Sequence, residues 1–170
     1  IQTRHGRTKD VAQALAAFVG HAYTSQATPW DRWLAGEADL LSDSAKEGAL
    51  LFFGRAGCAT CHAGSAFSDG APHNLAVPQF GPGVGSSQPE DLGAFDVRGD
   101  PSVRHAFVTP RLRNLSYSRP FMHNGAFDTL EGAILHHLDP LGGLRRYTSD
   151  DVPPVSRFVR NNAGHLPQRL

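Results

Sequence analysis

The sequence contains two cysteines, Cys58 and Cys61, and His62 follows directly after the second. Two thiols at this spacing form a disulfide in thioredoxin-like proteins, but there the motif follows a strand of a βαβ unit. Segment 44–53, shortly before Cys58, has a helical pattern instead. A zinc site needs four ligands, and the nine histidines include no pair at an obvious metal-binding spacing.

The third interpretation is the covalent attachment of haem c. The two thiols add across the vinyl groups of the haem, and the adjoining imidazole becomes the proximal iron ligand. Cys58, Cys61 and His62 have the required types and order. We therefore interpret the motif as the site of one covalent haem c. Because the thiols must be kept reduced and then ligated outside the cytoplasm, we expect a periplasmic or exported protein.

The composition excludes several other classes of protein. The chain has 170 residues, of which 40% are apolar and 19% charged, and its formal net charge is zero. A neutral chain is not typical of a general nucleic-acid binder or a protein of the membrane surface. Apolar runs such as Ala49–Phe53 are far too short to span a bilayer. Because Ile1 is not an initiator methionine, we expect a further segment upstream of it.

A helix predicted after residue 128 offers a second iron ligand. Asp128 or Thr129 caps it, and Glu131 is placed to complete a capping box with Asp128. One face of this helix carries His137 together with apolar residues, whereas His136 is turned by about 100° and is expected nearer solvent. That apolar face consists of Leu130, Ile134, Leu138 and Leu141. His137 is therefore the first candidate for the sixth iron ligand.

Two other residues compete for this position. Met122 is the single methionine of the chain, and ligation by histidine and methionine is common in haem c proteins that transfer electrons. A lone methionine is also a frequent gap-filler in a core. His123, next to Met122, is the third candidate.

The remaining pattern predicts a mainly α, cytochrome c-like domain in which long loops wrap the haem. Helices are expected at Asp10–Ala22 and from the N-cap Ser42 to about Phe53, the latter with Ala45, Ala49, Leu50 and Phe53 on its inner side. Gly54 and Gly57 end the second helix before the haem motif. Ala71–Gly99, rich in glycine and proline, is predicted as a long loop around a cofactor.

Within this loop, Phe80–Val97 suits either a partner-docking loop or a lid. One helical turn is expected at Asp100–Pro101, and the tail from Val152, with Val155, Phe158 and Val159, is expected to close the core.

An ordered set of motifs accompanies Cys58–Gly64. They are Thr28–Gly36, Gly48–Phe52, Phe67-Ser68-Asp69, His73-Asn74, Pro110-Arg111-Leu112-Arg113-Asn114-Leu115, Ser118–Gly125 and Thr129-Leu130-Glu131. With these motifs the chain resembles the C-terminal half of the bacterial dihaem cytochrome c peroxidase and MauG family. In that family the distal ligand of the C-terminal haem lies on the helix after the Ser118–Gly125 loop, and the corresponding residue is His137. Peroxidases place methionine at that helix position and MauG places tyrosine. Because the methionine of the loop is not the ligand in MauG, the resemblance makes Met122 less favoured as the ligand.

The resemblance implies three further features. Backbone carbonyls of Ser118 and Pro120 correspond to calcium ligands of the family, whose remaining protein ligand, an asparagine, belongs to the N-terminal domain. Arg113 corresponds to a family arginine, which pairs with either a haem propionate or a backbone carbonyl. Ala56 stands where MauG has a tryptophan between its haems, so electron hopping through that tryptophan is absent or replaced.

The resemblance also divides the chain into residues 1–40, the last helix and linker of an N-terminal haem domain, and residues 41–170, the C-terminal haem domain. The peroxide-reacting haem and its acid–base residues belong to the N-terminal domain, so no catalytic residue is expected in this chain. The implied function is electron transfer in a peroxidase-like oxidoreductase. Its partners are the N-terminal haem domain and either a small redox protein or a MauG-like protein substrate. The alternative is a single-haem electron carrier, or a haem subunit of a larger assembly, without peroxidase activity.

Overall fold

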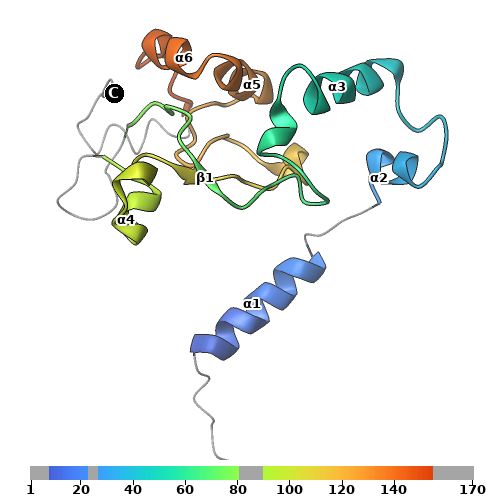
Figure 1. Ribbon diagram of the computed structural model, residues 1–170, viewed down its shortest axis with the longest axis horizontal. Helices are drawn as coiled ribbons and strands as arrows, with labels where there is room; N and C mark the ends of the chain where they lie inside the picture. The colour runs from blue at the N-terminus through green and yellow to red at the C-terminus, as the bar shows by residue number, and fades with distance from the viewer. Residues whose placement is uncertain (1–7, 23–26, 81–89, 155–170) are drawn as a thin grey trace, which may run out of the picture. The chain divides into compact units, whose positions relative to one another are not determined.

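The computed structural model describes residues 8–22, 27–80 and 90–154 (Figure 1). The chain divides into two compact units, Ile1–Gly57 and Cys58–Leu170. The haem motif begins at the first residue of the second unit. Whether residues 1–40 belong to another haem domain stays a prediction.

The described residues of the first unit form three helices: α1 (Thr8–Ala22), α2 (Pro29–Leu34) and α3 (Asp43–Phe53). Thr28 caps α2 in a reciprocal capping box with Asp31, and Pro29 occupies the first helical turn. The Ser42 side chain accepts a hydrogen bond from the Ala45 N–H at the start of α3, as predicted. Gly54 is the C-cap of α3, so the predicted end of this helix is confirmed.

The predicted inner side of α3 is wrong. Leu50 and Phe53 are exposed, and none of the described side chains of this unit is buried. Phe53 instead stacks on the Trp30 ring with 5.6 Å between ring centroids, and Trp30 also contacts Trp33. The aromatic side chains of α2 and α3 therefore pack on one another near the surface.

The second unit consists of short elements joined by ordered loops. Its elements are η1 (Cys58–Thr60), β1 (Pro72–His73), α4 (Ala94–Arg98), η2 (Pro101–Val103), β2 (Phe107–Val108), η3 (Leu115–Tyr117), α5 (Leu130–Leu138) and α6 (Pro140–Arg146). The strands β1 and β2 pair antiparallel, with His73 opposite Phe107. Asp100 caps η2, which confirms the helical turn predicted there. No helix among the described residues is long and apolar enough to cross a membrane.

The segment predicted as the loop Ala71–Gly99 is more structured than expected. It contains β1, the buried run Ala76–Phe80 and the helix α4. Residues 81–89, half of the suggested docking loop or lid, lie outside the described residues. The segment shows no sequence period because its elements are too short for one, and distant segments supply their packing partners.

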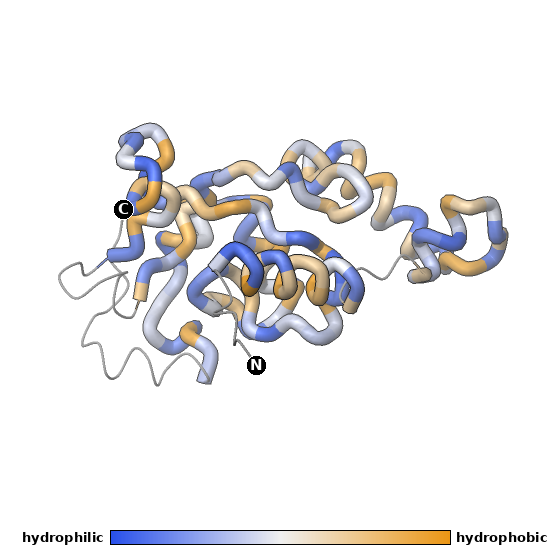
Figure 2. Tube along the Cα trace, turned by 90° about the horizontal axis from the view of Figure 1, so that it is seen from below, coloured by the Kyte–Doolittle hydropathy of each residue, from blue (hydrophilic) through white to orange (hydrophobic). Residues whose placement is uncertain are grey.

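The core of this unit is assembled from three separate parts of the sequence. Val77 and Phe80 pack with Ala126 and Val152, and the side chains of Leu75, Met122, Phe127 and Tyr147 border this cluster. Figure 2 shows that hydrophobic residues are spread over many short segments. Val152 is fully buried, as expected for the closing segment, whereas Val155, Phe158 and Val159 lie outside the described residues.

The start of α5 differs in detail from its prediction. Thr129 is the N-cap, and its hydroxyl accepts a hydrogen bond from the Gly132 N–H. Because the helix begins one residue later than a cap at Asp128 requires, Glu131 is not at the capping-box position, and that prediction is wrong. The helix ends at Leu138, so Leu141 belongs to α6, which Pro140 begins.

Replacing Tyr147 by phenylalanine is expected to lower the free energy of unfolding by about 1–2 kcal/mol. The partly buried Tyr147 hydroxyl donates to the Ala126 carbonyl at 2.7 Å, and burial raises the pKa of this phenol. Tyr147→Phe removes the hydrogen bond and keeps the ring. Urea unfolding followed by circular dichroism measures the loss. Tyr117→Phe is the matched control, because the Tyr117 side chain is 90% exposed and should show no change. Equal effects in the two variants would contradict the assignment.

Candidate functional site

The haem motif forms a tight turn at the start of the second unit. The N–H groups of Cys61 and His62 both donate to the Cys58 carbonyl, at 3.3 and 2.9 Å. Gly57, just before the turn, has φ +70°, a conformation that glycine adopts without steric cost. The two cysteines are partly exposed and do not form a disulfide. Both thiols and the following imidazole therefore lie on one short stretch of ordered backbone.

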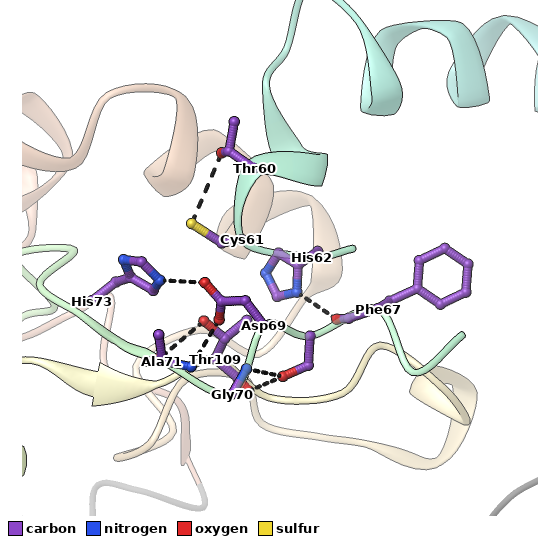
Figure 3. Close-up of polar contacts among 10 residues, drawn as sticks. Thr60, Cys61, His62, Phe67, Asp69, Gly70, Ala71, His73 and Thr109 are labelled. Atoms are coloured by element: carbon purple, nitrogen blue, oxygen red, sulfur yellow. Dashed lines mark hydrogen bonds and ion pairs between the residues drawn. The ribbon is translucent and has the colours of Figure 1, made fainter. Parts of the chain in front are cut away.

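The loop after the motif folds back over His62. The Ser68 N–H donates to the Ala63 carbonyl at 2.9 Å, and the Asp69 N–H donates to the Cys61 carbonyl at 2.8 Å. This turn brings the Phe67 carbonyl to 2.9 Å from Nδ1 of His62 (Figure 3). Because a carbonyl only accepts, Nδ1 carries the proton, and Nε2 is the nitrogen with a lone pair. A metal-binding histidine is held in this way through its other ring nitrogen.

His137 on α5 repeats this arrangement. Its Nδ1 donates to the Ala133 carbonyl, one helical turn earlier, at 2.7 Å. The rings of His62 and His137 have centroids 6.3 Å apart and planes inclined by 55°. Two imidazoles that bind one metal ion from opposite sides, through bonds of about 2 Å, have centroids about 6 Å apart. The distance and the tautomers therefore fit a pair of axial imidazole ligands.

The predicted exposure of His136 on α5 is wrong. His136 was expected nearer solvent, but it is 2% exposed. Its Nε2 donates to the Leu75 carbonyl at 2.8 Å, its ring contacts Phe127, and burial lowers its pKa. The narrow face with Ala133 and His136 is buried, and His136 binds it to Leu75, which borders the core.

The apolar face of α5 that carries His137 does not pack on the polypeptide. Ile134 and Leu138 are 49% and 60% exposed, and Leu130 is also exposed. Such an apolar surface beside two imidazoles and two thiols suits the flat, largely apolar ring of a haem, which fits the donor set of the motif. The sequence pattern placed Leu130, Ile134, His137 and Leu138 on one face, and in the structure these four residues are all exposed.

The two rival ligands have other contacts. Met122 is partly buried against the cluster of Val77, Phe80, Ala126 and Val152, with a backbone φ of +68°. The His123 ring stacks on the Phe107 ring with their planes inclined by only 9°. These contacts are those of packing residues.

The family positions on the 110–125 loop are ordered. Arg113 donates from Nε to the Ser65 carbonyl at 2.6 Å, and its guanidinium lies over the Phe67 ring. This is the backbone-carbonyl alternative of the sequence analysis. Ser118 ends η3, and Pro120 follows a cis peptide bond. A calcium ion on the Ser118 and Pro120 carbonyls stays a prediction.

One cluster beside the motif escaped the sequence analysis. The His73 ring and the Asp69 carboxylate form a hydrogen bond of 2.7 Å (Figure 3), and Asp69 also accepts from the Ala71 N–H. Mainly because of the bond to His73, the pKa of Asp69 falls from its ordinary 3.8 to about 2. Among the described residues, potential ligand atoms of Cys61, Asp69 and His73 lie within 4.8 Å of one another. The sequence signal that could have indicated this cluster is the spacing of four residues between Asp69 and His73.

The chain is similar over most of its length to curated bacterial proteins. The methylamine utilization protein MauG of Methylophilus methylotrophus is 35% identical over 129 residues, 75% of this chain. The cytochrome c551 peroxidase of Nitrosomonas europaea is 29% identical over 92% of this chain. A crystal structure of a MauG-like protein associated with microbial copper homeostasis superimposes on 78% of this chain, with a TM-score of 0.62 and 29% identity. The chain belongs to the cytochrome c peroxidase and MauG family. The resemblance of its motifs is thereby confirmed, although no family model matches the chain.

The chain spans only part of these family members. It covers 36% of the Methylophilus MauG, 45% of the Nitrosomonas peroxidase and 41% of the MauG-like crystal structure. The neighbouring structure supports the cytochrome c-like, mainly helical fold class for this part of the family.

Acid should destabilise the protein partly through Asp69. A carboxyl group whose pKa is lowered on folding stabilises the protein above its ordinary pKa, and this contribution is lost as the pH falls. The free energy of unfolding should therefore decline between pH 3.8 and about 2, and Asp69→Asn should flatten that decline. Urea unfolding across this pH range measures it. Asp128→Asn, which changes an exposed carboxylate of the same unit, should leave the decline in place. If the free energy of unfolding of Asp69→Asn fell as steeply with pH as that of the wild type, Asp69 would not contribute to acid destabilisation.

Proposed function

We propose that this chain is the electron-transfer haem domain of a periplasmic, peroxidase-like oxidoreductase. One haem c would be bound covalently through Cys58 and Cys61, with His62 and His137 as axial ligands. The observation that carries the proposal is the imidazole pair, with ring centroids 6.3 Å apart and each Nδ1 held by a backbone carbonyl. Membership of the cytochrome c peroxidase and MauG family supports it.

The residues of the site would each have a defined task. The thiols of Cys58 and Cys61 would anchor the group, and the Phe67 and Ala133 carbonyls hold the two Nδ1 atoms so that both Nε2 lone pairs could bind its iron. The apolar face of α5, with Ile134 and Leu138, covers the ring and excludes water. When bound, the haem supplies a reversible one-electron change at its iron. His62 and His137 would both hold the iron and would leave it no open position for peroxide, so we place no catalytic residue in this chain.

Peroxide chemistry then belongs to a part of the protein beyond this chain. We propose an N-terminal haem domain as the partner, since the chain spans less than half of its relatives. The electrons would come from a small redox protein if the enzyme reduces peroxide, or from a protein substrate if it resembles MauG. A calcium ion on the Ser118 and Pro120 carbonyls would lie next to that domain. The periplasmic location follows from the chemistry of haem attachment.

The alternative function is a single-haem electron carrier or a haem subunit without peroxidase activity. The same imidazole pair supports it, because a site with two strong ligands transfers electrons in either case. The encoded sequence before Ile1 separates the two functions. A second C-x-x-C-H motif there supports the dihaem oxidoreductase, and its absence supports the carrier.

The haem should stay attached to the denatured protein. After secretion through a host that matures c-type cytochromes, intact-mass measurement should show the polypeptide plus one haem. Replacing Cys58 and Cys61 together by serine should abolish this added mass, because no thioether bond can form. A wild-type protein with the mass of the bare polypeptide would contradict the proposal.

Variants of the candidate ligands test the second axial position. His137→Ala should convert the ferric haem from low spin to high spin, because it removes one strong ligand. Met122→Leu keeps a side chain of similar volume in the core and should stay low spin. Electron paramagnetic resonance of the two ferric proteins measures the change. Conversion in Met122→Leu, with low spin kept in His137→Ala, would overturn the assignment.

A further inference from the structure

Arg113 connects two loops that are far apart in the sequence. It follows β2 on the 110–114 loop, yet its Nε donates to the Ser65 carbonyl at 2.6 Å. Its guanidinium carbon also lies 5.6 Å from the centre of the Phe67 ring. The planar guanidinium thus contacts the 63–69 loop at two points, once through a hydrogen bond and once through its face.

Phe67 links Arg113 to His62, because it contacts both of these residues. Its carbonyl is the partner of the His62 Nδ1, at 2.9 Å. Its backbone φ of +53° lies in the left-handed region, which is rare for a phenylalanine and persists only where neighbouring contacts hold it. The Phe67 N–H donates to the Gly64 carbonyl at 3.1 Å, which closes the turn on one side. Arg113 holds the turn on the other side, through Ser65 and the Phe67 ring.

We propose that Arg113 is a positioning residue for the proximal ligand. By holding the 63–69 turn, Arg113 keeps the Phe67 carbonyl on the His62 Nδ1–H and so sets the electron density that His62 gives to the iron. The inference rests on the proposed function, because it needs His62 as an axial ligand. A hydrogen bond at Nδ1 makes the imidazole a stronger ligand, and a stronger ligand favours ferric over ferrous iron. Arg113 therefore lowers the reduction potential of this haem.

A charge effect has to be separated from a positioning effect. Removing a positive charge near the haem would itself lower the potential, so an uncharged variant would mix two opposite changes. Arg113→Lys keeps the charge, but an ammonium group cannot donate to Ser65 and cover the Phe67 ring at once. Phe67→Leu keeps both the Arg113 charge and the backbone carbonyl and removes only the ring. Arg111→Lys, at an exposed position two residues away, is the matched control.

The experiment is a spectroelectrochemical titration of the full-length holoprotein, with electron paramagnetic resonance of the same ferric samples. We expect a higher reduction potential and altered g-values in Arg113→Lys and, more weakly, in Phe67→Leu, with no change in Arg111→Lys. An unchanged potential in Arg113→Lys overturns the inference, and so does a shift that Phe67→Leu does not share, which indicates pairing with a haem propionate. If Arg113→Lys does not fold, Phe67→Leu decides the question by itself. A wild-type protein without covalent haem overturns the proposed function instead.

Discussion

The site depends on two hydrogen bonds from imidazoles to backbone carbonyls. His62 donates to Phe67 and His137 donates to Ala133, and each bond fixes both the tautomer and the direction of its ring. The first carbonyl belongs to a loop and the second to a helix, so they differ in rigidity. The Ala133 carbonyl lies one turn before His137 on the same helix, so α5 alone positions it, whereas the position of the Phe67 carbonyl needs the whole 63–69 turn. The rest of the fold therefore influences the site mainly through His62 and its partner Phe67.

Much of the second unit supports that turn. The Ser68 hydroxyl donates to the Thr109 carbonyl, and the Thr109 N–H donates to the Ala71 carbonyl, which joins the turn to β1 and β2. Arg113 holds it from the following loop. The small core around Val77 and Val152 in turn fixes the inner face of α5 through His136. A domain with little regular structure can thus bring the rings of two histidines from distant parts of the sequence to a centroid distance of 6.3 Å.

Local chemistry made part of this arrangement predictable. The types and spacing of Cys58, Cys61 and His62 predict haem attachment without reference to the rest of the fold. The capping residues Ser42 and Asp100 predict where two helical segments start. The exposure of His136 was not predictable, because a helix with two apolar faces does not reveal which one meets the protein. The buried run Ala76–Phe80 was missed because its partners, Ala126 and Val152, are far away in the sequence. The pair of Asp69 and His73 was not predicted, because the two side chains meet only through the fold of the chain between them, which the sequence pattern does not specify.

The central claim is that two imidazoles bind the iron of one covalent haem. The most direct measurement is near-infrared magnetic circular dichroism of the mature ferric protein, since the energy of the charge-transfer band depends on the pair of axial ligands. The account predicts a low-spin spectrum with the band of a bis-imidazole haem. A band at the position typical of imidazole and thioether ligation would contradict it and would make Met122 the distal ligand.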